Sequence, residues 1–215
     1  MISAWAVSNR LVMGQLKVND KSNEITAIPE LINLLDISGC IVTIDAIGCQ
    51  REIVKTIVQK EGDYVIALKS NQGNLHQNVE NLFKEAISKR CKGFKASNYS
   101  THEFGHGREE IRNYLMLTDV CKHIEESEKW ENFQSIGMVE SVRIVNGETT
   151  VETRYYITSL GLDAKKFGNS VRSHWRIENS LHWVLDVGFH EDDCRIRKDM
   201  RRKILQFFAI LQLTF

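Results

Sequence analysis

The sequence predicts a mixed α/β fold in one domain, and three features of its apolar pattern support this prediction. The chain opens with two adjacent strand-like segments, residues 2–7 and 11–18, which are expected to form a hairpin. Two short continuous apolar runs follow at residues 40–44 and 64–68, as is typical of strands buried on both faces. Apolar residues at helical spacing separate these runs, and the alternation of strands and helices indicates a mixed α/β core.

Three amphipathic helices are predicted in the first half of the chain. The first is expected to end at Gly39 and the second at Gly62, and the single proline, Pro29, is expected where the first helix begins. The third follows the polar segment 69–72. Their apolar faces carry Ile28, Leu31, Ile32 and Leu35; Ile53, Val54, Ile57 and Val58; and Leu75, Val79, Leu82, Phe83 and Ile87.

The second half is expected to be rich in strands before it returns to a helix. Asn146-Gly147 is a strong hairpin signal, and the acidic run within residues 125–131 is expected to be a solvated face. Asp163 is expected to cap the final helix. The predicted strands are residues 98–103, 109–117, 135–145 and 149–157, and the final helix carries Phe167, Val171, Trp175, Glu178, Leu181, His182 and Leu185 at helical spacing.

The composition is that of an ordinary soluble protein. Lys and Arg total 28 and Asp and Glu total 28, so any affinity for nucleic acid or membrane must come from local patches. With 215 residues, of which 42% are hydrophobic, the chain can bury a full core. Its five cysteines form no Cys-x-x-Cys pair and are expected to be reduced and structural. The sequence shows neither a cationic leader nor a bilayer-length apolar stretch, so we expect a cytoplasmic protein without a membrane partner.

Asp45 is the first candidate functional residue, because it directly follows the buried apolar run 40–44. Carboxylates that bind metal ions often lie at such a strand tip. The alternative interpretation is a helix N-cap, since only a short loop separates Asp45 from the next helix. The residues alone leave both interpretations open.

Glu178 is the second candidate, because its apolar neighbours on the final helix imply burial and a buried carboxylate needs a partner. The alternative interpretation is an ion pair with Arg172 or Arg176. Two hard divalent cations that clamp a phosphodiester need carboxylate oxygens from separate elements. Asp45 and Glu178 together therefore suggest a divalent-metal site for phosphoryl transfer.

The segment from His102 to His106 matches the His-Glu-x-x-His pattern of zinc metalloproteases. That pattern works on a helix, where both histidines share one face. Here glycines at 105 and 107 interrupt it, and the flanking residues indicate two strands joined by a tight turn. A zinc metalloprotease is therefore the distant alternative.

A basic cluster follows the Glu178 region and suits a phosphate backbone. Its alternative interpretation is a solvated face that nearby acidic residues partly balance. Its position after a candidate metal carboxylate favours DNA binding. The cluster consists of Arg195, Arg197, Lys198, Arg201, Arg202 and Lys203.

Five segments carry a family resemblance: Val42-Thr-Ile-Asp-Ala46, Ala67-Leu-Lys-Ser-Asn-Gln72, His106-Gly-Arg-Glu-Glu-Ile-Arg112, Arg154-Tyr-Tyr-Ile-Thr-Ser159 and residues 172–197. In this order they resemble the ISAs1 family of insertion-sequence transposases, which includes the H-repeat-associated proteins. The resemblance covers nearly the whole chain. The segment around Glu178, Trp-x-Ile-Glu-Asn-x-Leu-His-Trp-x-Leu-Asp-Val, is specific rather than generic.

The resemblance implies a DDE transposase with a ribonuclease-H-like mixed sheet, flanking helices and metal-dependent DNA cleavage and strand transfer. Two aspartates and a glutamate bind Mg²⁺ or Mn²⁺ in that family, and Asp45 would be the second aspartate and Glu178 the glutamate. Residues 1–215 would form part of the catalytic domain, with a β-rich insertion at 98–158 between the two ligands. The implied partners are the DNA ends of the element, contacted by Lys69 and the basic cluster, and a second copy of the chain in a homo-oligomer.

The sequence also departs from the family. The first aspartate of this fold lies on a strand before the two that open this chain, so that first strand is expected to be missing. Asp20 and Asp36 are the nearest upstream aspartates, but their surroundings are turn-like. A missing central strand would expose a pairing edge. With an unusual tail after Lys203, the chain is expected to be a truncated, inactive copy, and the alternative is a non-catalytic DNA-binding or dimerising remnant.

Overall fold

The computed structural model describes residues 2–7, 11–17, 24–105, 107–177 and 210–214. Within this part of the chain, nine strands form one mixed sheet in the order β2-β1-β9-β3-β4-β8-β7-β6-β5. The mixed α/β class predicted from the sequence is confirmed. The strands are β1 (Ile2–Ala6), β2 (Leu11–Leu16), β3 (Ile41–Ile44), β4 (Asp63–Leu68), β5 (Lys95–Gly105), β6 (Arg108–Thr118), β7 (Ser135–Val145), β8 (Glu148–Thr158) and β9 (Ile210–Thr214).

The first strands follow the sequence prediction closely. β1 and β2 form an antiparallel hairpin, and β3 and β4 pair in parallel with Ile44 opposite Ile66. All four residues of β3 are buried, because helices cover both of its faces. Since β3 and β4 run in the same direction, their carboxyl ends lie at the same edge of the sheet.

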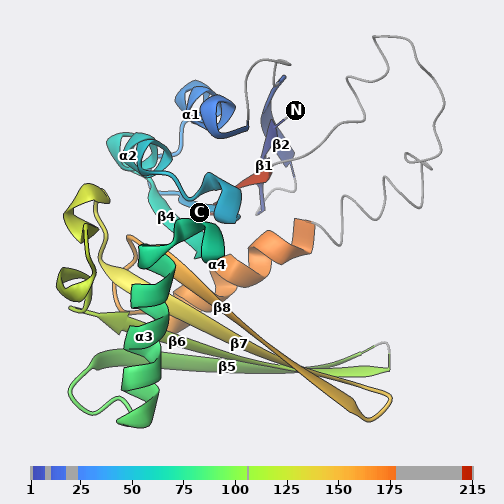
Figure 1. Cartoon of the computed structure of the whole chain (residues 1–215). Helices are drawn as coiled ribbons and strands as arrows, with labels where there is room; N and C mark the ends of the chain where they lie inside the picture. The colour runs from blue at the N-terminus through green and yellow to red at the C-terminus, as the bar shows by residue number, and fades with distance from the viewer. Residues whose placement is uncertain (1, 8–10, 18–23, 106, 178–209, 215) are drawn as a thin grey trace.

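The expectation of an exposed edge beside β3 is wrong. β9 lies between β1 and β3, parallel to β1 and antiparallel to β3, so the edge of β3 is paired (Figure 1). The expectation failed because strand pairing is decided in three dimensions. A short apolar segment at the far end of the chain can supply backbone donors and acceptors to a central position of the sheet.

Four long strands extend the sheet beyond β4. β8 pairs antiparallel with β4, and β7, β6 and β5 follow in antiparallel order. The β7–β8 connection uses Asn146 and Gly147, whose φ angles are 51° and 83°. A turn with two positive φ angles matches the right-handed twist of the flanking strands, which confirms the hairpin prediction.

Four helices flank the sheet: α1 (Glu24–Leu34), α2 (Arg51–Gln59), α3 (Asn74–Ser88) and α4 (Ala164–Ile177). Pro29 lies inside α1 rather than at its start, because the helix begins at Glu24. The N–H that proline lacks would have met the carbonyl of Ile25, in the first turn, so little of the helix is lost. Asp163 accepts a hydrogen bond from the backbone N–H of Lys166 at 2.9 Å and caps α4 as predicted.

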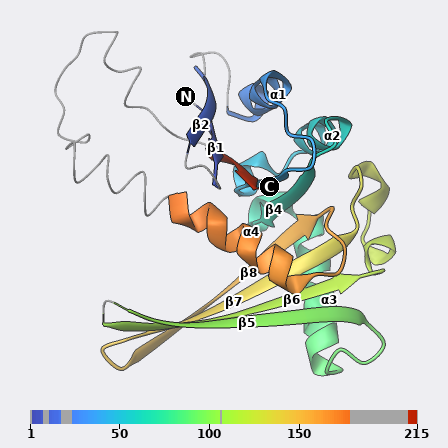
Figure 2. The same cartoon turned by 180° about the vertical axis from the view of Figure 1, so that it is seen from behind.

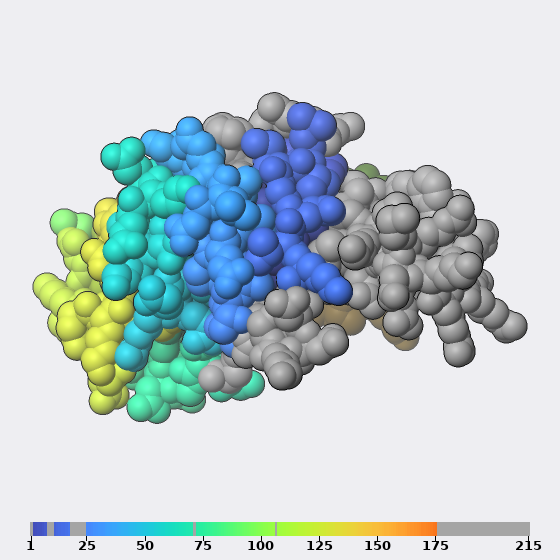
Figure 3. Space-filling model, turned by 90° about the horizontal axis from the view of Figure 1, so that it is seen from above, coloured from blue at the N-terminus to red at the C-terminus, as the bar shows by residue number. Residues whose placement is uncertain are grey.

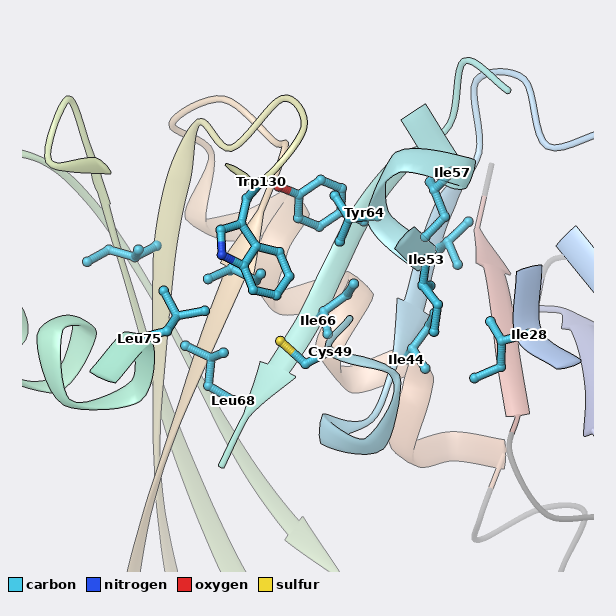
Figure 4. Packing of buried hydrophobic residues seen from close by; sticks show 14 of the residues in the cluster. Ile28, Ile44, Cys49, Ile53, Ile57, Tyr64, Ile66, Leu68, Leu75 and Trp130 are labelled. Carbon is cyan, nitrogen blue, oxygen red and sulfur yellow. The ribbon is translucent and has the colours of Figure 1, made fainter. Parts of the chain in front are cut away.

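The helices divide between the two faces of the sheet. On one face, α1, α2 and α3 cover a core that includes Tyr64 and Ile66 of β4 (Figure 4). On the other face, α4 packs Phe167 against Val65 and Tyr114 (Figure 2). This division follows from the alternation of side chains along β4.

The outer surface of the first face is formed by α1 and α2, which lie side by side next to the β1–β2 hairpin (Figure 3). Among the described helices, none combines the length and the apolar composition that a bilayer crossing requires.

Candidate functional site

Asp45 lies at the carboxyl end of β3, at the strand tip that the sequence predicted. Its Oδ1 also accepts a hydrogen bond from the backbone N–H of Ile47 at 3.1 Å and so caps the short 3₁₀ helix η1 (Ala46–Gly48). A Cβ at position 48 would lie 2.2 Å from Cγ2 of Ile44, so glycine is needed for this tight turn. Asp45 therefore lies at the predicted strand tip and caps η1, whereas the N-cap of the following helix α2 is Gln50.

Lys69 lies at the equivalent position after β4, just before the 3₁₀ helix η2 (Ser70–Gln72). Its side chain is exposed. Lys69 and Asp45 line one pocket of about 400 Å³, because the parallel strands β3 and β4 end at the same edge. The pocket thus brings together two of the residues singled out from the sequence.

His174 of α4 forms part of the opposite wall of this pocket. Its Nδ1 lies 3.2 Å from Oγ1 of Thr43, which ties α4 to β3. Burial lowers the pKa of His174 below its ordinary value, the charge of Asp45 opposes this shift, and the charge of Arg154 adds to it. The lowered pKa favours the uncharged imidazole at neutral pH, and the carboxylate of Asp45 and the guanidinium of Arg154 act on it in opposite directions.

Arg154 of β8 is held on two sides. Its guanidinium lies 4.0 Å from the ring centroid of Trp175, and its Nε and Nη2 donate to the two carboxylate oxygens of Glu152 at 2.7 and 2.9 Å. Burial raises the pKa of Tyr156 to about 12, although hydrogen bonds with Trp175 and Arg154 oppose the shift. The result is a fixed cation in the same pocket as Asp45.

Arg154 is not among the site residues predicted from the sequence. The available signal was the spacing of Glu152 and Arg154, two charged residues on alternate positions of one strand, followed by two tyrosines. The stacking on Trp175 could not be read from the sequence, because it depends on how α4 crosses β8.

Several predicted site residues lie outside the described part of the chain. These are Glu178, Arg195, Arg197, Lys198, Arg201, Arg202 and Lys203. Arg172, one of the two arginines proposed as an ion-pair partner of Glu178, is among the described residues. Arg172 donates from Nη2 to Glu103 at 2.6 Å, so its ion pair is made with the β-rich segment.

The His-Glu-x-x-His segment does not lie on a helix, as the zinc-metalloprotease interpretation requires. His102 lies within β5 rather than on a helix, and its Nε2 lies 2.7 Å from Glu109 on the neighbouring strand. Over the described ranges, no group of three or more His, Cys, Asp or Glu residues gathers as a metal site would require.

The donor chemistry of the Asp45 pocket suits a hard divalent cation only in part. Asp45 offers carboxylate oxygen, the ligand type that Mg²⁺ and Mn²⁺ prefer. The other carboxylate in the described lining is Glu152, whose two oxygens are bonded to Arg154. Further ligands would have to come from beyond the described residues.

Comparison with known proteins identifies the family. Residues 1–213 match the family described as the transposase DDE domain. The chain belongs to the DDE transposase family. Domains of this family use divalent metal ions, which agrees with a carboxylate at the tip of β3.

Three relatives in Escherichia coli are similar to this DDE transposase chain over most of its length. YbfL of strain K12, whose name states no function, is 43% identical over 202 residues, covering 92% of this chain and 53% of the relative. YhhI of strain K12, named as a candidate transposase associated with the H repeat, is 42% identical over the same shares. YncI of strain O157:H7, named as a candidate transposase, is 41% identical over 208 residues, 95% of this chain and 53% of the relative.

The DDE transposase chain thus spans about half the length of the curated relatives that it matches. No solved structure matches it.

Proposed function

We propose that this chain forms the Asp45 and Glu178 part of the catalytic domain of an ISAs1-group insertion-sequence transposase, which cuts and joins DNA. The observation that carries the proposal is the position of Asp45. It lies at the carboxyl end of a buried parallel strand, in a pocket that it shares with two cations, Lys69 and Arg154. A carboxylate that can hold a metal ion thus lies beside cations that can contact the phosphates of DNA.

The proposed cofactor is Mg²⁺ or Mn²⁺, held by Asp45 and Glu178. When bound, a pair of such ions activates the attacking water or DNA 3′-hydroxyl and stabilises the leaving oxygen. Lys69 would neutralise a phosphate at the mouth of the pocket. His174, uncharged at neutral pH and bonded to Thr43, would keep the wall beside Asp45 in place.

We further propose that the chain alone is inactive. The resemblance calls for two aspartates and a glutamate, and within the described lining of the pocket Asp45 is the carboxylate that is not paired with an arginine. A non-catalytic DNA-binding or dimerising role would follow if no other segment completes the site.

The remaining parts of the proposal concern organisation. Residues 98–158 would be an insertion between the two ligand-bearing elements, and the basic cluster after Glu178 would bind the ends of the element. A homo-oligomer would bring two such ends together. A cytoplasmic location is supported by the cysteines that the structure describes, Cys40, Cys49, Cys91 and Cys121, all of which are free thiols.

The proposal is tested in a chimera in which this chain replaces the matching segment of YhhI. Asp45→Asn removes the charge but keeps a capping oxygen for Ile47, so the turn survives. We expect metal-dependent strand transfer to fall by roughly 10³-fold, which corresponds to losing several kcal/mol of metal-borne stabilisation.

Asp36→Ala is the matched control. Asp36 accepts from the backbone N–H of Ser38 at 3.3 Å, the same local bond that Asp45 makes, but it lies outside the described lining of the pocket. An active Asp45→Asn chimera would show that the charge of Asp45 is not needed, and an Asp36→Ala chimera that loses as much activity would show that the loss is not specific to the pocket.

A further inference from the structure

A second pocket, of about 340 Å³, opens on the α4 face of the sheet. We call it the arginine groove, after the five arginines in its lining: Arg108 and Arg112 of β6, Arg143 of β7, Arg154 of β8 and Arg172 of α4. The chain as a whole carries no net charge, so this concentration of one residue type is a local feature.

The ion pairs inside the arginine groove leave positive charge in excess. Arg112 pairs with Glu110, and Arg108 and Arg143 approach the same carboxylate at 3.4 and 3.9 Å. Three guanidinium groups thus share one side chain. The pairing follows from the strand register, which places Glu110 directly opposite Arg143.

The other two arginines are paired with carboxylates that are largely exposed. Arg172 and Arg112 share Glu103, which is 45% exposed, and Arg154 pairs with Glu152, which is 59% exposed. Ion pairs with exposed partners contribute little to stability, so these pairs do not by themselves account for five arginines on one surface. Five guanidinium groups face three carboxylates, and the surface suits a polyanion.

The arginine groove adjoins the Asp45 pocket. Arg154 and Trp175 line both of them, so the two pockets are neighbours along β8 and α4. A polyanion that follows the arginines would reach Asp45 at one end. Planar guanidinium groups bind phosphate oxygens in pairs, and a nucleic-acid backbone presents regularly spaced phosphates to several arginines at once.

We propose that the arginine groove binds the phosphate backbone of duplex DNA and leads one strand to Asp45, with Arg154 at the junction. This inference rests on the proposed function and extends it, because it assigns DNA contacts to the β-rich segment and α4 in addition to the basic cluster beyond Glu178. Arg108 and Arg143 provide the outer contacts, since their side chains are 41% and 51% exposed.

The test is the salt dependence of binding to a short fluorescent DNA duplex, measured by anisotropy with the whole chain. Arg108→Ala/Arg143→Ala keeps the fold, because Arg112 still pairs with Glu110. Each phosphate contact contributes about 0.9 to the slope of log K against log salt, so the double variant is expected to lower the slope by about two and the affinity on the order of tenfold.

The control is Arg51→Ala/Lys89→Ala, which removes two exposed cations paired with exposed glutamates outside the described lining of the groove. It is expected to leave the slope unchanged. The proposal is overturned if the groove variant binds like the wild type, if the control loses as much, or if polyglutamate of equal charge competes as well as DNA.

Failure of this inference is distinguishable from failure of the proposed function. In the YhhI chimera, Asp45→Asn is expected to keep DNA binding and its salt slope while strand transfer is lost. Strand transfer that persists in that variant contradicts the proposed function, independently of the DNA binding measured for the arginine variants. An unchanged salt slope in the arginine double variant contradicts only the proposal that the arginine groove binds DNA.

Discussion

Two arginines in this chain lie beside a tryptophan and a glutamate, and their surroundings differ. Arg154 lies 4.0 Å from the ring of Trp175 and pairs with Glu152, and it shares its pocket with Asp45 and Lys69. Arg51 lies 6.0 Å from the ring of Trp130 and pairs with Glu126, in a pocket that also contains Glu52 and Glu125. The same local arrangement therefore occurs once in a pocket where two cations balance two carboxylates, Asp45 and Glu152, and once in an acidic pocket.

This difference shows that an arginine beside a tryptophan and a glutamate does not by itself mark a functional site. Trp130 is only 7% exposed and belongs to the main core, so Arg51 covers a structural residue. Trp175 is partly buried at the rim of the second core, where α4 meets β8, and Arg154 faces the tip of β3. The Arg154 arrangement differs because it lies beside Asp45 and the arginine groove.

The largest expected effect is on the free energy of unfolding, which replacing either of the two tryptophans should lower by different amounts. Trp130→Ala removes a buried core side chain and is expected to cost about 3–5 kcal/mol in the free energy of unfolding. Trp175→Ala is expected to cost roughly 1–2 kcal/mol, because its side chain is less buried. Urea denaturation of both variants measures the difference, and equal losses would mean that Trp175 is a core residue like Trp130.

A smaller effect concerns pH. Because the pKa of His174 is lowered from 6.5 in the folded protein, the unfolded chain takes up a proton first as pH falls. Between the two pKa values the unfolded state binds more protons, so stability is unaffected well above pH 6.5 and decreases as pH falls below it. The groups facing the imidazole are Asp45, which opposes the shift, and Arg154, which adds to it.

His174→Asn is expected to flatten this decrease in melting temperature between neutral and mildly acidic pH. Thr43→Val is the matched control, because it breaks the hydrogen bond to Nδ1 but keeps the titrating group. If His174→Asn retains the full pH dependence, the imidazole does not carry it.

Much of the fold could be predicted from the apolar pattern, because that pattern reports which face each element buries. The run ending at Ile44 predicted a strand buried on both faces, and Asn146-Gly147 predicted its hairpin. The position of β9 could not be predicted, since a five-residue apolar segment carries no information about which strand it joins. The start of α1 predicted from Pro29 was wrong, because the helix accommodates the proline early in its length.

The candidate site was predictable in part for the same reason. Asp45 stood out because it ended an apolar run, whereas Lys69 was singled out through the family resemblance. The arginine groove was hidden, because its members come from three strands and a helix and meet only through the register of β6, β7 and β8. Alternate charges at 108, 110 and 112 were the available signal for a shared face.

The most direct test of the account is where a divalent ion binds on this chain. Mn²⁺ can be titrated into isotope-labelled protein while the broadening of backbone amide signals is followed by NMR. The account predicts selective broadening around Asp45 and Lys69, its loss in Asp45→Asn, and none near Arg51 and Trp130. Broadening centred on the acidic pocket around Glu125 and Glu126, or broadening at Asp45 that survives Asp45→Asn, would contradict it.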